Sequence, residues 1–299
     1  GNMTAADLVK FLTKTIRADR LTSLLAQSRE IEGQTHPTFR LVGPLDKPEG
    51  ITFAGGEVLA EQVSLVNPSL PQRLTAMHGR ILFSQTGGAQ FDQVTANVGE
   101  TQLQFNGMIS GGTPSVFQDF VIRAKGSAAQ LRQMVSAGTF PDDLLYGMVN
   151  AKVQLSGPSG APHLRGEIGL NDAKLVLPMV GEKPLGSPAS LELDADVTRG
   201  VGLVISRMEL VVPPLRLPLK GHITLGDQFS IDASLASGTV SLSSLPEWIY
   251  RSGFEAGNLE ISMDVKGTDA EWRNWRTGGW LALTNGLMSV KGVDGQVED

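Results

Sequence analysis

The sequence contains no cysteine among its 299 residues. This absence excludes a disulfide framework, a thiolate nucleophile and a zinc site built on cysteine. No run of about 18 apolar residues is present either, which excludes a membrane-spanning helix in this segment. The net charge is −6 and no basic cluster stands out. Nucleic acid is therefore not expected as a partner.

Catalytic and metal-binding patterns are also missing. No Gly-x-Ser-x-Gly elbow, no His-Glu-x-x-His pair and no phosphate-binding loop occurs. The four histidines are scattered without a second ligand at metal spacing: His36, His78, His163 and His222. Asp194 and Asp196 are two residues apart on a predicted strand, where both would lie on its solvated face. We therefore predict no catalytic residue, no metal site, no cofactor and no enzymatic activity.

Apolar residues make up 41% of the chain and charged residues 19%, enough to form a hydrophobic core. Glycine is frequent, with 35 residues, whereas tryptophan and tyrosine together number six. This balance is typical of many strands joined by turns rather than of a helical bundle.

One phrase of alternating apolar residues occurs three times. Its clearest copy is Gly166–Pro178, and blurred copies occupy Gly56–Pro68 and Gly279–Val290. The copies begin 110 and 113 residues apart, which indicates a repeat architecture of about that period. We interpret the phrase as the first pair of strands in each repeat. Because the chain stops inside the third copy, and Gly1 is typical of a tag-cleavage site, we expect a section of a longer protein.

The N-terminal segment has helical periodicity from Thr4 to about Glu32, with Gly33 as a stop signal. Thr4 and Asp7 resemble a capping box, in which side chains satisfy backbone amides at the start of a helix. The apolar stripe fits either a membrane surface or the end of a sheet. Acidic residues among the basic ones favour packing on the sheet.

The predicted organisation has four parts. They are an N-terminal amphipathic helix and linker at 1–50, a first β-repeat at 51–165, a second β-repeat at 166–278 and the start of a third repeat at 279–299. Each full repeat contains a short helix and a later strand. The helices are predicted at Ser127–Ala137 and Ser241–Ser252, and the strands at Gly147–Gly157 and Gly257–Gly267. Short turns between strands favour antiparallel pairing.

Strict alternation sends the aliphatic residues of each strand to one face. That face must be hidden by a second sheet, by closure into a barrel, or by a ligand in a curled, trough-like sheet. The pattern alone leaves these three solutions open. For a trough, the candidate lining residues are Leu203, Ile205, Leu215, Leu217, Leu219, Ile223, Leu225, Phe229 and Ile231.

Four tryptophans, Trp248, Trp272, Trp275 and Trp280, fall near the C-terminal end of the chain. They fit either a membrane-interface belt or packing in the core and at the sheet edge. We favour packing, because it is the commoner role of tryptophan in a sheet protein.

The pattern G-x-[IL]-x-L-x-[ND]-[AG]-x-[LM]-x-[LV], at Gly166–Leu177 and Gly279–Val290, resembles the repeat of AsmA-like and TamB-like envelope proteins. The lead-in Leu155-Ser156-Gly157, followed by a proline-rich turn, is similar too. The resemblance implies a long twisted antiparallel sheet, curled into an apolar groove, in the periplasm of a Gram-negative cell. It also implies an anchor in the inner membrane, which would lie outside this chain.

The resemblance further implies that phospholipid, or another lipid with acyl chains, is the ligand. Lipid transport or outer-membrane assembly would then be the process served, with other envelope proteins as possible partners. A second hypothesis is a structural or protein-interaction scaffold whose apolar faces are fully packed. Whether the groove is open separates the two.

Overall fold

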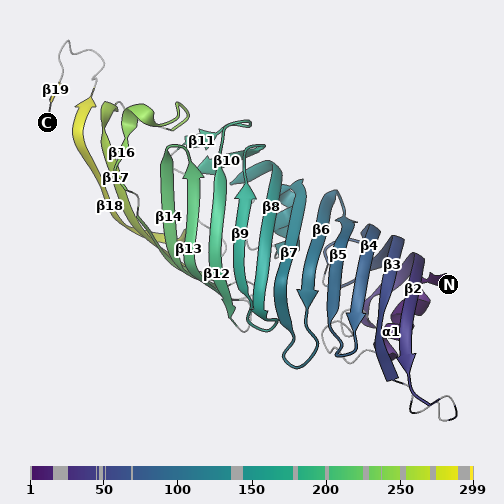
Figure 1. Cartoon of the computed structure of the whole chain (residues 1–299). Coiled ribbons are helices and arrows are strands. Elements are labelled where there is room, and N and C mark those ends of the chain that lie inside the picture. The colour runs from purple at the N-terminus through teal and green to yellow at the C-terminus, as the bar shows by residue number, and fades with distance from the viewer. Residues whose placement is uncertain are drawn as a thin grey trace. The chain divides into compact units, whose positions relative to one another are not determined.

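The computed structural model describes residues 2–15, 26–44, 46, 50, 52–68, 70–135, 144–177, 181–198, 202–224, 229–236, 238–249, 254–269, 274–288 and 297–298. They form mainly β structure with antiparallel pairing, a helix near the N-terminus and a short helix between strands (Figure 1). This confirms the predicted fold class. By contacts the chain forms two compact units. Unit 1 is Gly1–Gly126 with Lys152–His163, and unit 2 is Ser127–Ala151 with Leu164–Asp299.

Unit 1 is a meander of long strands that are neighbours in sequence and in space (Figure 1). Its elements are β1 (Met3–Thr4), α1 (Ala5–Thr15), β2 (Arg29–Val42), β3 (Thr52–Val66), β4 (Leu74–Ser84), β5 (Ala89–Val98), β6 (Thr101–Ile109) and β7 (Val116–Ser127). The second half of β8 (Leu145–Pro158) also belongs to this unit. Turns such as Thr86–Gly88 connect the strands, because glycine adopts the positive φ that tight turns require.

Helical structure near the N-terminus ends earlier than the sequence predicts. α1 covers Ala5–Thr15, and Ala26 and Gln27 are also helical, whereas Arg29–Glu32, predicted to be helical, begins β2 instead. Pairing with β3 along β2 from Arg29 to Val42 provides backbone hydrogen bonds that outweigh the weak helical pattern of these residues. The N-terminal segment is therefore helix plus a full strand, not helix plus linker. Residues 16–25 lie outside the described residues.

The same β-bulge occurs three times in unit 1. In each case one glycine with positive φ opposes two residues of the next strand, the first of which also has a positive φ. The pairs are Gly33 with Gln62–Val63, Gly79 with Gln93–Val94 and Gly107 with Asp119–Phe120. A Cβ on Gly107 would lie only 2.5 Å from Phe120 Cα, so no larger residue fits there.

The bulges form a row across the sheet of unit 1. Ala60, two residues before the bulge in β3, pairs with Gly79, and Phe91, two residues before the bulge in β5, pairs with Gly107. Each bulge bends its strand and increases its twist. It also shifts the alternation by one residue. In β3 the buried positions change from Val58 and Ala60 to Val63.

Unit 2 contains the remaining elements. They are α3 (Ala128–Val135), the first half of β8, β9 (His163–Gly169), β10 (Ala173–Leu177), β11 (Gly181–Lys183), β12 (Ser190–Thr198), β13 (Gly202–Val212), β14 (Leu215–Thr224), β15 (Ser230–Ala236), β16 (Val240–Ser241), the 3-10 turn η2 (Leu242–Ser244), β17 (Phe254–Gly267), β18 (Arg276–Met288) and β19 (Val297–Glu298). α3 and the strands β8 and β17 lie at the positions predicted for them.

The repeated phrase lies within a single strand in two of its copies and spans two strands in the third, so the predicted pair of strands is found in one copy only. Its copies lie in β3, in β9 with β10, and in β18. The sixth residue after the first glycine is the point of interruption each time: Gln62 and Asn285 have positive φ, and Asp172 lies in the turn between β9 and β10. β9 and β10 do not pair with each other, because β10 pairs with β8 and β11. The boundaries of the 110-residue repeats stay a prediction.

The helix predicted at Ser241–Ser252 is wrong in its described part. Only Leu242–Ser244 forms a turn of 3-10 helix, and Leu245 is extended, with φ −68° and ψ 144°. The cause is Pro246, because a proline disfavours the helical conformation of the residue before it. Among the described residues, no helix is long and apolar enough to cross a bilayer.

Candidate functional site

The apolar face of unit 1 is the face on which α1 packs. Leu8 and Leu12 of α1 are buried against Val58, Phe83 and Ala89. Thr4 Oγ1 accepts a hydrogen bond from the Asp7 backbone amide, as the capping box predicts. The Thr4 hydroxyl also donates a hydrogen bond to the Asp7 carboxylate at 2.7 Å. The expected packing of this helix on the end of a sheet is confirmed. At about 1.5–3 kcal/mol per buried leucine, the contact holds the helix to the sheet.

Phenylalanine lines this face on both sides of the bulges. Phe11 of α1 stacks on Phe39 of β2, with ring centroids 4.7 Å apart. In β5 to β7, Phe120 lies 5.4 Å from Phe91 and 5.5 Å from Phe117. Phe120 is buried, whereas Phe91 and Phe117 stay half-buried. Eight of the eleven phenylalanines precede residue 121. This concentration is the signal in the sequence that could have indicated the face.

In unit 2 the structure brings eight of the nine predicted lining residues together. Cross-strand pairing aligns Leu203 of β13 with Ile223 of β14, and Ile223 with Ile231 of β15. Leu217 and Leu219 of β14 continue the same face. We call it the apolar face of unit 2. Leu225 lies outside the described residues.

The apolar face of unit 2 is covered at one end. Leu215 is 3% exposed and, with Leu217, packs against Leu242, Leu245 and Ile249. Leu242 lies in η2, and Leu245 and Ile249 lie in the segment that follows it. This end of the face is therefore closed by the chain itself.

The cover is less complete further along β14. Phe229 stacks on Trp275, with ring centroids 5.9 Å apart, and the buried Ile231 packs beside them. Leu203, Leu219 and Ile223, however, are only half-buried. Leu219 and Ile223 pack against the cluster of Phe229 and Ile231, and the three aliphatic side chains form a strip that is still partly accessible.

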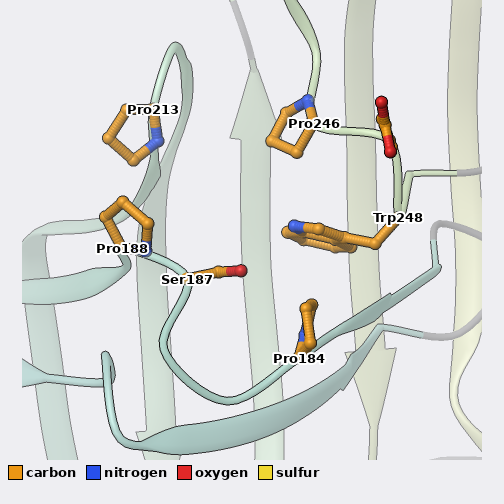
Figure 2. Close-up of a pocket in the computed structure, with 7 residues that line it drawn as sticks. Pro184, Ser187, Pro188, Pro213, Pro246 and Trp248 are labelled. Carbon is orange, nitrogen blue, oxygen red and sulfur yellow. The ribbon is translucent and has the colours of Figure 1, made fainter.

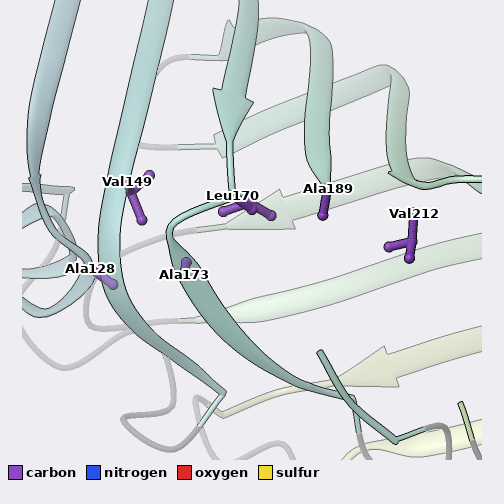
Figure 3. Packing of buried hydrophobic residues seen from close by; sticks show 6 residues of the cluster. All are labelled: Ala128, Val149, Leu170, Ala173, Ala189 and Val212. Carbon is purple, nitrogen blue, oxygen red and sulfur yellow. The ribbon is translucent and has the colours of Figure 1, made fainter. Parts of the chain in front are cut away.

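A third apolar cluster in unit 2 consists mainly of small buried side chains. Its buried members are Ala128, Val149, Leu170, Ala173, Ala189 and Val212 (Figure 3). They come from α3, β8, β10 and β13, from the residue after β9 and from the residue before β12. Alanines at the centre let backbones approach closely, so this cluster fixes strands rather than holding a ligand.

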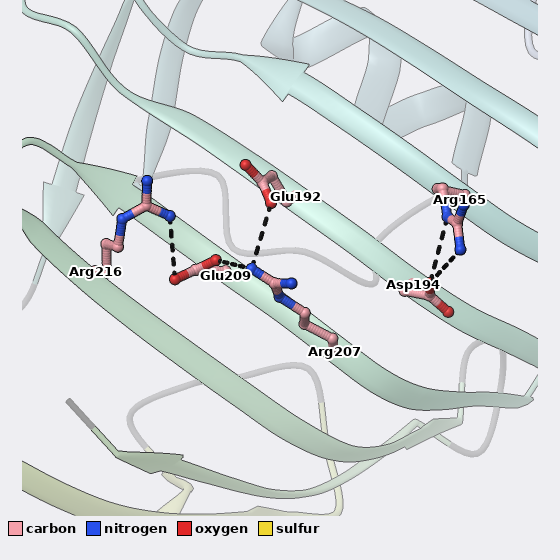
Figure 4. A network of polar contacts seen from close by, with 6 residues as sticks. All are labelled: Arg165, Glu192, Asp194, Arg207, Glu209 and Arg216. Carbon is pink, nitrogen blue, oxygen red and sulfur yellow. Dashed lines mark hydrogen bonds and ion pairs between the residues drawn. The ribbon is translucent and has the colours of Figure 1, made fainter. Parts of the chain in front are cut away.

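The opposite face of unit 2 is polar and crossed by ion pairs (Figure 4). The side chain of Glu209 is 8% exposed. Its carboxylate accepts a hydrogen bond from Arg207 at 2.5 Å and lies 3.4 Å from the guanidinium of Arg216. Arg165 pairs with Asp194 at 3.2 Å. The hydrogen bond from Arg207, with a further one from Arg216, lowers the pKa of Glu209 although burial acts to raise it. Asp194 thus lies on the polar face, as predicted.

Lys183 is completely buried. Its Nζ donates to three backbone carbonyl oxygens, those of Asn171 at 3.3 Å, Ala173 at 2.7 Å and Pro184 at 3.0 Å. Burial lowers the pKa of Lys183, and the charge of Asp172 opposes this shift. The three bonds tie β10, β11 and the following loop together. Nothing in the residue pattern around Lys183 indicated that this lysine is internal.

A cavity of about 400 Å³ lies beside this loop. Its walls are formed by Trp248, Ser187, Glu247 and four prolines. The prolines are Pro184, Pro188, Pro213 and Pro246. Figure 2 shows Ser187 pointing toward the indole of Trp248. Trp248 also packs into the clusters around Val212 and Leu215, so its position is fixed. The lining holds one carboxylate, that of Glu247, and one hydroxyl, that of Ser187, with no histidine, lysine or arginine.

The described residues contain no group of three or more His, Asp or Glu side chains that could hold a metal ion. His36 lies 3.2 Å from Glu61 and 3.0 Å from Asn2, and His222 lies 3.3 Å from Thr224. These are pairwise surface contacts. The apolar faces are therefore the best candidate for a functional site in the part of the chain that is described.

No protein-family model matches this sequence, and neither a curated protein nor a solved structure matches it. The resemblance to AsmA-like proteins therefore stays a prediction from the sequence.

Proposed function

We propose that this chain binds the acyl chains of phospholipid or a similar lipid along the apolar faces of its sheet. It acts as a non-enzymatic periplasmic segment of an AsmA-like protein in lipid transport or outer-membrane assembly. Anchoring to the inner membrane would come from a part outside this chain. The observation that carries the proposal is the half-buried aliphatic strip of Leu203, Leu219 and Ile223.

The mechanism is solvation and requires no chemical step. Each methylene of an acyl chain that leaves water for the apolar face contributes about 0.8 kcal/mol. A charged head group stays in water beside the sheet, because burying an unpaired charge is costly. The row of bulges in unit 1 supports the proposal, since bulges bend and twist the strands of a sheet, as a groove requires.

The test is lipid extraction and native mass spectrometry of the purified protein. We expect phospholipid to copurify and to be lost in Leu203→Glu, because a carboxylate on the strip repels acyl chains. Val204→Glu is the matched control. Val204 is the next residue of β13, points to the opposite face and is 40% exposed. This variant should keep its lipid.

A structural scaffold is the second candidate. It is favoured by the contact of α1 with the face of unit 1 and by the closed end around Leu215. If the apolar faces are packed along their whole length, as a scaffold requires, the wild type carries no lipid. Leu203→Glu then unfolds unit 2, because its carboxylate is forced into a packed core.

A further inference from the structure

The cavity beside Trp248 has walls that the main chain of unit 2 holds in place. One wall is the loop after β11, and another is the segment after η2. Gly181 of β11 forms an antiparallel bridge with Ile249, the residue after Trp248. A Cβ on Gly181 would collide with the carbonyl oxygen of Trp248, so only glycine allows this approach. The bridge therefore fixes the spacing between the two walls.

The loop after β11 is also fixed by hydrogen bonds. The Nζ of Lys183 donates to the carbonyl oxygen of Pro184 at 3.0 Å. The amide of Gly186 donates to the carbonyl oxygen of Asn171 at 2.8 Å, and the amide of Ala189 donates to Asn171 Oδ1 at 3.0 Å. Proline rings stiffen the walls further, because each ring fixes φ. A ligand that enters does not have to order these walls, which favours binding.

The lining combines apolar rings with one negative charge. Figure 2 shows Pro188 and Pro213 on one side of the cavity and Pro246 and Trp248 on the other. The proline rings carry no N–H group and cannot donate a hydrogen bond. Glu247 is exposed, and no ion pair joins it to another described residue. A carboxylate beside such rings favours a cation over an anion as the ligand.

The buried ammonium of Lys183 does not cancel this preference. Lys183 is not part of the lining. Its Nζ is bonded to three backbone carbonyl oxygens, and the charge of Asp172 favours its charged form. Glu247 is the one charged side chain of the lining.

We propose that this cavity binds a trimethylammonium group, such as that of choline or of a choline lipid. A trimethylammonium ion has no N–H group, so it needs no hydrogen-bond acceptor when it leaves water. Its methyl groups contact the proline rings and the indole, and its charge lies beside Glu247. A primary ammonium has three donors to satisfy. The side chains of the lining offer only the carboxylate of Glu247 and the hydroxyl of Ser187.

The size of the cavity agrees with a small ligand. Its volume of about 400 Å³ lies within the usual range of small-molecule sites, roughly 300–1,000 Å³. The proposal does not depend on the binding of acyl chains to the apolar faces. Either proposal can fail while the other stands.

The indole N–H signals of tryptophan in nuclear magnetic resonance test the site. Protein labelled with nitrogen-15 tryptophan contains four indole groups, and Trp248→Phe identifies the signal of Trp248. We expect choline to shift that signal until the site is saturated. The neutral compound 3,3-dimethyl-1-butanol has the shape of choline without its charge. It should shift the signal far less, because Glu247 would lose water without gaining an opposite charge.

Two glutamine variants test the role of the carboxylate. Glu247→Gln keeps the shape of the side chain and removes its charge. We expect it to bind choline about two- to fivefold more weakly, the usual effect of a partly solvated ion pair. Glu167→Gln is the matched control, at an exposed glutamate of β9 outside the lining, and should bind choline as the wild type does.

Three results would overturn the proposal. They are the absence of a shift with choline, an equal shift with 3,3-dimethyl-1-butanol, and equal choline affinity in Glu247→Gln and Glu167→Gln. A short-chain phosphatidylcholine, used below its critical micelle concentration, separates the two sources of the group. Binding tighter than that of choline identifies a lipid head group as the ligand, and weaker or equal binding identifies a free cation. The proposed site stands in both cases.

Discussion

Substituting Gly107 by alanine tests the bulges that shape unit 1. Gly107 has φ +125°, and its added Cβ would collide with the backbone of β7, 2.5 Å from Phe120 Cα. Gly112 is the matched control in the same unit. It has φ +107°, but nothing lies within 4 Å of its Cβ position. Both variants are destabilised by placing alanine at a positive φ. Only Gly107→Ala is further destabilised by a steric clash with a neighbouring strand.

The two contributions differ in origin and can be separated. A non-glycine residue held at such a φ costs about 1–3 kcal/mol. The collision adds about 1–3 kcal/mol, as overpacking does in a core. We therefore expect Gly107→Ala to be less stable than Gly112→Ala by about 1–3 kcal/mol. With a urea slope of about 2 kcal/mol per molar, the midpoints should differ by about 1 M.

Urea unfolding followed by far-UV circular dichroism measures the difference. Tryptophan fluorescence supplies a second signal, because all four tryptophans belong to unit 2. A change confined to unit 1 shifts the dichroism transition more than the fluorescence transition. Equal midpoints for the two variants would refute the argument that the bulge requires glycine because of its neighbour.

Three further predictions concern unit 2. Lys183→Met should lower stability by about 1–3 kcal/mol in thermal unfolding, because buried carbonyl oxygens lose their donor. No loss relative to Lys174→Met, at a lysine whose side chain is 43% exposed and pairs with Glu182, would contradict this. The lowered pKa of Glu209 means that its contribution to stability is complete above the ordinary glutamate pKa and disappears as pH falls through the lowered value. Glu209→Gln should therefore be less stable than wild type at neutral pH, with the gap closing in acid; a gap independent of pH would refute it. Leu217→Glu should unfold unit 2, since Leu217 packs under the segment after β16, and circular dichroism would detect the loss of strand structure. A variant that stays folded would show that this segment does not cover Leu217 tightly.

The sequence predicted the class of fold well because alternation is a local property. Residues such as Leu203, Ile223 and Ile231 were placed on one face by period-two spacing alone, and the pairing of β13 to β15 confirms their alignment. The same spacing could not reveal which part of the face is covered. That depends on the segment around Leu245, which is distant in sequence and was predicted to be helical.

Other features could not be predicted from the sequence because they depend on contacts between strands. A bulge such as that at Gly79 needs two neighbouring strands in register, so the glycine alone suggests only a turn. The burial of Lys183 follows from three carbonyls that converge only after β10 and β11 pair. The error at Arg29–Glu32 has the same origin, because pairing with β3 overrode a helical pattern.

The central claim, that apolar faces of the sheet hold acyl chains, is tested most directly by a fatty acid carrying a photoreactive diazirine on its chain. After irradiation, the labelled residues are identified by mass spectrometry of peptides. The account predicts adducts on the strip of Leu203, Leu219 and Ile223, and on Phe91 and Phe117 of unit 1. Absence of adducts, or labelling equally strong at Val204 on the opposite face, would contradict it.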